Sequence, residues 1–188
     1  PYDWERFDVL TMPPSFPYGG MENPRLTFLT PTVIAGDRSL VSVLAHELAH
    51  SWTGNLVTNA NAEHFWLNEG FTVFAERRIL EALYGSDVMI LNAAVGRHRL
   101  GKAVERFAPH PELTRLQTSL GGVDPDEAFS DVPYEKGYLF LRAIEEIVGR
   151  QAFDGFLRGY VGRYRFGAIT TAQFLETLEE LLPGVAKK

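Results

Sequence analysis

The stretch "SVLAHELAHSWTGN", residues 42–55, decides how the rest of the chain is interpreted. It places His46 and His50 four positions apart, with Glu47 directly after the first histidine. Residues four apart lie on one face of an α-helix, about 6 Å apart along its axis. Both rings can therefore direct a nitrogen at a single metal ion from about 2.1 Å.

Two imidazoles do not complete a catalytic zinc site, which usually takes three protein ligands and leaves one position for water. The segment "FWLNEGFTVFAE", residues 65–76, supplies Glu69 near the start of the next expected helix. Enough chain separates it from His50 for a turn back against the first helix. The sequence therefore predicts that His46, His50 and Glu69 bind one metal ion.

Glu47 flanks these ligands and is free for a different task. Zinc lowers the pKa of a bound water to about 7, and a neighbouring carboxylate can take its proton and pass it to a leaving amine. His-Glu-x-x-His on a helix is the metalloprotease motif. The alternative is structural, since a lone helical histidine usually serves packing and Glu69 alone is typical of a helix N-terminus.

Composition limits the function classes. The chain has 188 residues, 45% hydrophobic and 22% charged, as expected for one globular domain with its own core. A net charge of −6 argues against nucleic acid or an anionic membrane as a partner. No apolar run approaches the roughly 18 residues that a membrane span needs. The chain has no cysteine, which leaves histidine and carboxylate as metal ligands and is compatible with a cytoplasmic protein.

The remaining patterns predict an α+β fold, with a small mixed sheet at the N-terminal end and a mostly helical remainder. Alternating or β-branched segments predict strands, the second of them an edge strand because Pro24 and Pro31 bracket it. Apolar periodicity predicts further helices, and "GGVDPDEAFSDVPYEKG" is expected to be a long loop. The expected strands cover residues 6–12 and 25–30, and the expected later helices cover residues 67–83, 86–107, 135–148, 151–164 and 171–182.

The helix that carries the histidines is expected to begin after Asp37 or Ser39 as N-cap and to stop at Gly54. Apolar residues recur along it every three or four positions, which predicts a buried face. The residues of that face are Leu40, Val43, Leu44, Leu48 and Trp52.

Three separated motifs resemble the M1 family of aminopeptidases, a gluzincin family. The first is His46-Glu47-Leu48-Ala49-His50 followed by Glu69; the second is "GGMENP", residues 19–24; the third is "PYEKG", residues 133–137. The surrounding sequence is most similar to the branch that contains leukotriene A4 hydrolase and aminopeptidase B. The resemblance implies a thermolysin-like zincin catalytic domain.

The resemblance also implies roles for single residues. His46, His50 and Glu69 would hold one Zn²⁺ per chain, and Glu47 would act as general base and then acid. Glu22 would bind the free α-amine of a peptide, with the neighbouring motif residues along the substrate. Tyr134 would donate its hydroxyl to the oxyanion of the tetrahedral intermediate. The neighbouring motif residues are Gly19, Gly20, Met21 and Asn23. Without the resemblance, Glu22 would be interpreted as an exposed loop acid and Tyr134 as a half-buried aromatic.

Asp126 falls where the leukotriene enzyme has an aspartate connected with epoxide hydrolysis, so it is a candidate substrate-binding residue. The competing interpretation is a turn aspartate, because Asp126 follows Pro125. Phe129 stands where a tyrosine is expected in the mammalian hydrolase, which argues against a leukotriene activity and leaves peptidase chemistry untouched.

We therefore expect residues 1–188 to be an M1 catalytic domain excised from a longer chain, without the N-terminal β domain and C-terminal helical domain that flank it in this family. The expected function is zinc-dependent hydrolysis of the N-terminal peptide bond of peptides that have a free N-terminus. One alternative is a bifunctional epoxide hydrolase of the leukotriene A4 hydrolase type. Another is a fragment that binds zinc and peptides with little turnover.

Overall fold

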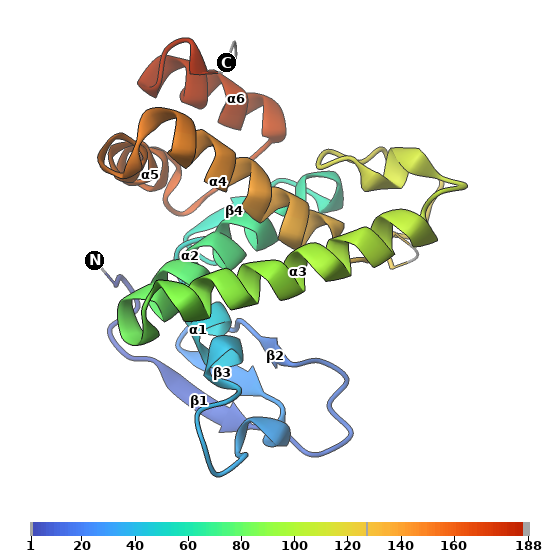
Figure 1. Cartoon of the computed structure of the whole chain (residues 1–188), viewed down its shortest axis with the longest axis vertical. Coiled ribbons are helices and arrows are strands. Elements are labelled where there is room, and N and C mark those ends of the chain that lie inside the picture. The colour runs from blue at the N-terminus through green and yellow to red at the C-terminus, as the bar shows by residue number, and fades with distance from the viewer. Residues whose placement is uncertain (1, 127, 186–188) are drawn as a thin grey trace.

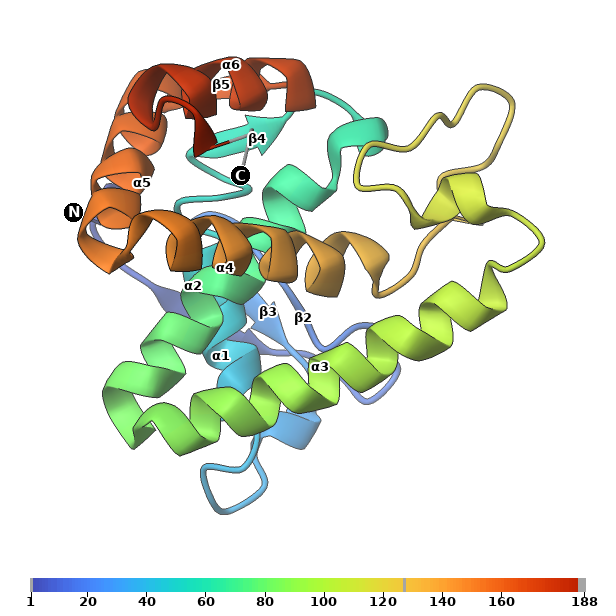
Figure 2. The same cartoon turned by 45° about the horizontal axis from the view of Figure 1, so that its top comes forward.

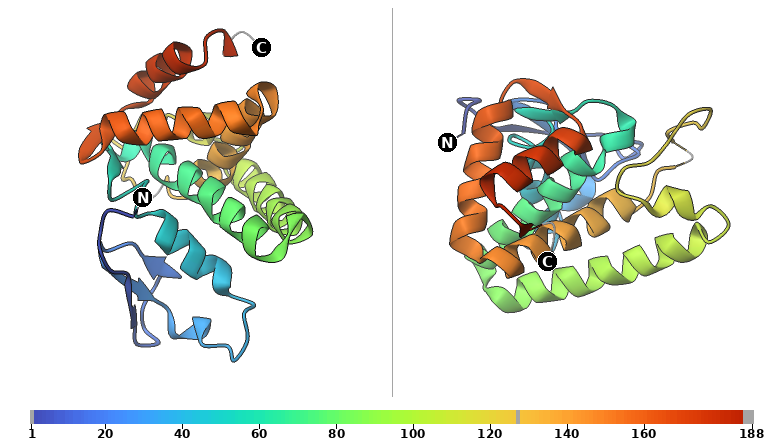
Figure 3. Two further views of the ribbon diagram at one scale, coloured as in Figure 1. Left: turned by 90° about the vertical axis from the view of Figure 1, so that its left-hand side faces the viewer. Right: turned by 90° about the horizontal axis from the view of Figure 1, so that it is seen from above.

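The computed structural model describes residues 2–126 and 128–185, which form a small sheet region below a larger helical region (Figure 1; Figure 3, left). The strands are β1 (Asp8–Thr11), β2 (Gly20–Met21), β3 (Leu26–Leu29), β4 (Val57–Asn59) and β5 (Gly167–Ile169). The α-helices are α1 (Val41–Ala49), α2 (Trp66–Tyr84), α3 (Ser86–Arg106), α4 (Gly137–Val148), α5 (Arg150–Tyr164) and α6 (Thr171–Leu181). Shorter helical turns are η1 (Pro31–Val33), η2 (Ala62–His64), η3 (Pro111–Thr114) and η4 (Val132–Lys136).

The N-terminal sheet is mixed, which confirms the α+β prediction. Its order is β1-β3-β2, with β1 parallel and β2 antiparallel to β3. The prediction that residues 25–30 form an edge strand was therefore wrong, because β3 is the central strand. Pro24 and Pro31 lie just outside its paired residues, so neither removes a hydrogen bond from the ladder. A second, parallel pair joins β4 to β5, two strands too short for the sequence pattern to reveal.

Helix α1 begins later than predicted and without a side-chain cap. Its N-cap is Leu40, and the Asp37 carboxylate instead accepts a hydrogen bond from the Ser39 backbone N–H in the preceding turn. Short-range bonds of this kind compete with capping for the same carboxylate.

The predicted buried face of α1 was also wrong. The buried residues of this helix are Ala45, Glu47 and Ala49, whereas Leu40 is 37% exposed and the other predicted residues are half-buried. α1 packs against α2, β2 and β3 with the side that carries its small and polar residues. The side of α1 that faces the interior is therefore the side that carries the candidate site, and its polar residue Glu47 is buried there.

The later helices lie where the sequence predicted them. α2 and α4 both end at glycines with positive φ, Gly85 at 89° and Gly149 at 84°, a conformation that favours glycine. The N-cap of the last helix, Thr170, forms a full capping box with Gln173. Local signals therefore define these helix ends.

The hydrophobic core lies between α2, α4, α5 and α6 and extends to β4 and β5, with α3 along the outer side of α2 (Figure 2). Aromatic rings dominate it: the rings of Phe71 and Tyr160 stack with centroids 4.9 Å apart, and Phe174 lies edge-on to Trp66 at 5.0 Å. Burying such rings is the main favourable term of folding. This core holds α2 rigidly, and with it every site residue that α2 carries.

The expected loop of residues 121–137 is only partly a loop, because Val132–Lys136 form the π-helical turn η4, which continues directly into α4 at Gly137. In the described part of the chain, no helix is both long and apolar enough to cross a membrane.

Candidate metal centre

Three side chains from α1 and α2 converge on one point. The Nε2 atoms of His46 and His50 are 3.1 Å apart. Glu69 Oε2 lies 3.2 Å from the first and 3.5 Å from the second. The histidine spacing sets both rings on one side of α1, and the packing of α1 on α2 brings Glu69 opposite them. The structure thus brings together the three predicted metal ligands.

The spacing of these atoms fits a tetrahedral metal ion. Metal–donor bonds of about 2.0–2.1 Å would place tetrahedral donor atoms roughly 3.3 Å apart. Glu69 Oε2 is also buried without a hydrogen-bond partner among the described residues. A buried carboxylate oxygen left unpaired is costly, and a cation at this point would pair it. The donor set, two imidazoles and a carboxylate, is one that zinc accepts.

The second nitrogen of each ring orients it. His50 Nδ1 lies 2.9 Å from the Thr53 carbonyl oxygen, which can only accept, so Nδ1 carries the proton and Nε2 offers its lone pair. His46 Nδ1 lies 3.0 Å from Glu76 Oε2 and likewise donates its N–H, which leaves Nε2 as the nitrogen that faces the candidate metal position. Ligating histidines generally donate their other N–H to a carboxylate or carbonyl in this way.

Glu76 and the asparagines described below were missed by sequence reasoning. Glu76 had a usable signal, because it follows Glu69 by seven positions, two turns along the same face of α2. The Glu76 carboxylate also adds negative charge next to His46. Burial lowers the pKa of His46, but the Glu69 and Glu76 carboxylates outweigh burial and raise that pKa to about 10. Burial lowers the pKa of His50.

Glu47 lies beside this group and is buried at 6% exposure. Burial raises its pKa to about 8; the His46 charge lowers it, and the charges of Glu22 and Glu69 raise it further. The backbone of Gly20 packs on this carboxyl group, and a Cβ there would lie 2.6 Å from Glu47 Cγ. Only glycine fits this contact without displacing Glu47.

Glu22 is held next to Glu47 by two asparagines. Asn55 Nδ2 donates to the Glu22 backbone carbonyl at 2.7 Å, and Asn68 Nδ2 donates to Glu22 Oε1 at 3.4 Å. Acceptor or donor atoms of Glu22, Glu47 and His50 all lie within 4.8 Å of one another. The predicted amine-binding carboxylate and the predicted base therefore meet at His50, one of the predicted metal ligands.

The rest of the "GGMEN" motif follows the same edge of the site. Gly19 lies against Val43 of α1: a Cβ added to Gly19 would be 3.8 Å from Val43 Cγ1, an ordinary van der Waals contact. Met21 is 37% exposed, and the side-chain nitrogen of Asn23 is buried without a described partner. Residues 20–21 form β2, a short strand that runs along the site.

Tyr134 reaches the site from the turn η4. Its ring stacks on that of His46, with centroids 6.2 Å apart, and lies edge-on to Phe65 and Phe129. Burial, followed by the negative charges of Glu69 and Glu22, raises the pKa of Tyr134 well above its usual range. The phenol therefore stays protonated and remains a hydrogen-bond donor.

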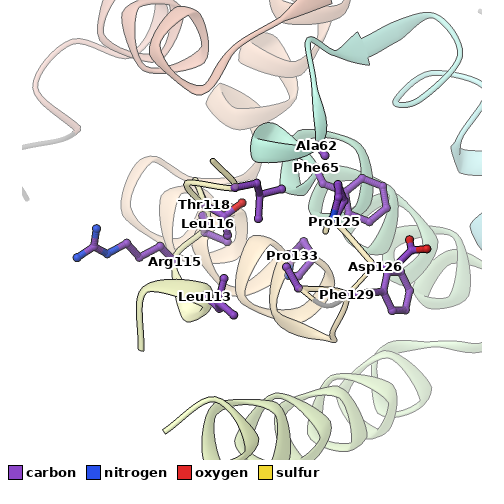
Figure 4. Close-up of a pocket in the computed structure, with 12 residues that line it drawn as sticks. Ala62, Phe65, Leu113, Arg115, Leu116, Thr118, Pro125, Asp126, Phe129 and Pro133 are labelled. Carbon is purple, nitrogen blue, oxygen red and sulfur yellow. The ribbon is translucent and has the colours of Figure 1, made fainter. Parts of the chain in front are cut away.

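Asp126 lies outside the groups of described residues that could hold a metal ion. It belongs to a turn, in which its N–H donates to Asp124 Oδ1 and its carbonyl accepts from the Phe129 N–H. It also lines an apolar pocket of about 200 Å³ (Figure 4). Two rings of that lining, Phe65 and Phe129, lie edge-on to Tyr134, so the pocket is next to that residue. The pocket is lined by Ala62, Phe65, Leu113, Arg115, Leu116, Thr118, Leu120, Pro125, Asp126, Ala128, Phe129 and Pro133.

The three remaining histidines lie outside the candidate site. His64 is buried and its Nδ1 lies 3.0 Å from Thr171 Oγ1, whereas His98 and His110 are exposed.

Known proteins resemble this chain over nearly its whole length. The peptidase family M1 domain matches residues 1–187. Leucine aminopeptidase 2 of Neosartorya fischeri is 51% identical over 178 residues, covering 95% of this chain and 29% of the relative. Aminopeptidase B of Rattus norvegicus is 50% identical over 190 residues, covering 100% of this chain and 29% of the relative.

Solved structures agree. Leukotriene A4 hydrolase from Saccharomyces cerevisiae matches with a TM-score of 0.92 at 48% identity, covering 97% of this chain and 30% of that one. An M1 zinc metallopeptidase from Deinococcus radiodurans matches with a TM-score of 0.77 at 27% identity, covering 100% and 38%. This chain thus spans less than a third of the curated relatives' length. Sequence, fold and the convergence of the three motifs lead to one conclusion: the chain belongs to the M1 peptidase family, and it is similar to leucine aminopeptidase 2, aminopeptidase B and leukotriene A4 hydrolase.

Proposed function

We propose that this chain is the zinc-binding catalytic part of a cytoplasmic metallo-aminopeptidase that releases the N-terminal residue of peptides. One observation carries the proposal: the ligand group (His46, His50 and Glu69) and the acidic group (Glu22 and Glu47) share His50. A carboxylate for the substrate amine therefore lies beside the carboxylate suited to act on water. The names of the relatives, which are aminopeptidases, support the same chemistry.

His46, His50 and Glu69 would hold one Zn²⁺ per chain. Bound there, zinc would lower the pKa of a water ligand and polarise the scissile carbonyl. The protein supplies the remaining steps. Glu47 takes the proton from the attacking water and passes it to the leaving amine.

Two further groups act on the substrate. Glu22 binds the free α-ammonium, which limits cleavage to the first peptide bond, while Gly19 and Gly20 let the peptide backbone approach. The Tyr134 hydroxyl donates to the oxyanion of the tetrahedral intermediate. Losing such a donor typically raises the barrier by about 2.7–4 kcal/mol.

Peptides with a free N-terminus are thus the proposed substrates. We further propose that residues 1–188 form one catalytic domain, which a longer chain flanks with an N-terminal β domain and a C-terminal helical domain. The relatives are more than three times longer than their matched portions, which supports this arrangement. Because flanking domains would help to exclude water and position substrate, we expect lower turnover from the 188-residue chain alone.

The test compares zinc content and aminoacyl-amide hydrolysis in wild type, Glu47→Gln and a control, Glu105→Gln, on the exposed surface of α3. We expect about one zinc per chain in all three and turnover in wild type and control. Glu47→Gln should retain zinc and lose turnover. Retained turnover in Glu47→Gln would remove that residue from the mechanism, and absent zinc would remove the ligand assignment.

A second candidate function is epoxide hydrolysis of a lipid. The observation in its favour is the apolar pocket beside Tyr134, which has Asp126 on its lining. Phe129, which stands in place of an expected tyrosine, argues against the leukotriene reaction. A lipid epoxide assayed beside aminoacyl amides, in wild type and Asp126→Asn, separates the two functions. If zinc and peptide bind without hydrolysis of either substrate, the chain is a binding fragment instead.

A further inference from the structure

A buried ion pair, Arg77 with Glu135, lies next to Tyr134 in the fold and has no part in the chemistry described above. Arg77 of α2 and Glu135 of η4 are 4% and 6% exposed. Arg77 Nη2 lies 2.9 Å from Glu135 Oε1 and 2.6 Å from Oε2. The Tyr138 ring covers the guanidinium, with Arg77 Cζ 3.9 Å from the ring centroid.

The fold makes room for this pair. Gly96, in the middle of α3, is buried against it, and a Cβ at that position would overlap both the Glu135 carboxylate and the Arg77 guanidinium. Three elements, α2, α3 and η4, thus pack around one salt bridge. The Nε and Nη1 atoms of Arg77 are buried and have no hydrogen-bond partner among the described residues. Because these donors lose their bonds to water on folding, the pair adds little to the free energy of unfolding.

A second contact fixes the same turn at its other side. Gly70 and Gly137 meet backbone to backbone, and a Cβ on Gly70 would lie 2.7 Å from Gly137 Cα and 3.2 Å from the Pro133 carbonyl oxygen. Pro133 and Gly137 flank Tyr134 in the chain, and Gly70 follows the metal-binding Glu69. The turn η4 is therefore pinned across α2 at two places, beside Glu69 and at Arg77.

This arrangement determines where the Tyr134 side chain can lie. Tyr134 directly precedes Glu135, and both are on the five-residue π-helical turn. π-helical turns have no long run of regular hydrogen bonds to define them, and they are frequent at functional sites. Their geometry depends on tertiary contacts. A shift of Glu135 would move Tyr134 relative to Glu69 and His46, which α2 and α1 hold in place.

We propose that Arg77 and Glu135 are positioning residues for the Tyr134 hydroxyl, acting by clamping η4 onto the helix that carries Glu69. A buried ion pair contributes little net stability compared with apolar residues of similar size, so its value here is geometric. The inference rests on the proposed function, because it assigns a purpose to the position of Tyr134.

The test uses the zinc-loaded chain with Glu135→Gln, which keeps the shape of the side chain and removes its charge. The matched control is Glu145→Gln, because Glu145 is equally buried and also pairs with an arginine of α2, the adjacent Arg78, but on α4. A fluorotyrosine placed only at position 134 gives a ¹⁹F resonance that does not depend on activity. We expect Glu135→Gln to shift or broaden it and Glu145→Gln to leave it unchanged.

Kinetics supply the second measurement. We expect Glu135→Gln to lower kcat roughly tenfold with KM within about twofold, as for loss of an interaction made in the transition state. In a Tyr134→Phe background the same substitution should change kcat by less than about twofold, because its effect passes through the hydroxyl. Should Glu135→Gln not fold, Arg77→Lys, which keeps the charge and loses the fork, replaces it.

Two results would overturn the proposal: an unchanged ¹⁹F resonance in the folded variant, or an equal loss of kcat with and without the Tyr134 hydroxyl. If wild type fails to hydrolyse aminoacyl amides, the proposed function fails, and the ¹⁹F comparison still decides whether Arg77 and Glu135 position Tyr134.

Discussion

The carboxylate of Glu76 lies 3.0 Å from Nδ1 of His46, on the opposite side of that ring from Glu69. His46 is thus held between two carboxylates of α2, one as a candidate metal ligand and the other as the partner that orients the ring. Glu76 is half-buried, with its side chain 14% exposed, so water screens this contact less than it would at the open surface. Helix α2 therefore supplies both the third candidate ligand, Glu69, and the carboxylate that orients His46, Glu76.

Replacing Glu76 should therefore weaken metal binding without removing a ligand. We expect Glu76→Gln to raise the zinc dissociation constant by about 10–100-fold, because the ring loses its oriented acceptor. Competition with a chelator measures this constant, with Glu105→Gln as control. Unchanged affinity would show that packing alone orients His46.

Metal binding should also depend on pH through His46. Its pKa near 10 means that the metal-free site carries a proton at neutral pH, which a metal ion must displace. Raising the pH towards 10 removes that competition, so zinc affinity should rise by up to about tenfold per pH unit. Chelator competition at several pH values measures the slope. Glu76→Gln removes one cause of the raised pKa and should give a shallower slope; a flat dependence in wild type would contradict this account.

Gly20 should be required for turnover and not for metal binding. A side chain there would overlap the Glu47 carboxyl group, so Gly20→Ala must displace the proposed base. We expect kcat to fall on the order of 10–100-fold with zinc content unchanged. The control is Gly101→Ala on α3, where a Cβ would meet nothing within 4 Å. Equal kcat values in the two variants would mean that Glu47 tolerates displacement.

The crossing of Gly70 and Gly137 should matter for stability. Gly137→Ala would force α2 and α4 apart, and we expect it to lower the free energy of unfolding by about 1–3 kcal/mol. Gly155→Ala, at an open position on α5, should instead raise it by about 0.5–1 kcal/mol, since alanine is the better helix former. Urea denaturation measures both values. A stabilising Gly137→Ala would show that the helices can separate at no cost.

Much of the site and of the helical region could be predicted, because the signals for them lie within a few neighbouring residues or in recognisable motifs. His46 and His50 share a helix face by their spacing, and Thr170 with Gln173 forms a capping box within one helical turn. Glu69 could be placed only at the start of the following helix, without its distance from the histidines. Burial of the leucine side of α1 was the wrong expectation, because apolar periodicity assumes that the interior is apolar, and here the interior contains the site.

Other relationships had no local signal at all. Asn55 and Asn68 reach Glu22 from segments more than thirty residues away, and nothing in their own neighbourhood distinguishes them from surface asparagines. The central position of β3 depends on β1 and β2 pairing on both of its edges, which its flanking prolines do not reveal.

By itself, the sequence determined where most of the helices lie and that His46 and His50 share one helix face, because helix periodicity, capping and motif spacing act over a few neighbouring residues. Only the tertiary structure decided that Glu76 supports His46, that Gly20 lies on Glu47 and that Arg77 meets Glu135. These contacts join elements far apart in the chain, and their geometry follows from how α2 packs against its neighbours around the aromatic core.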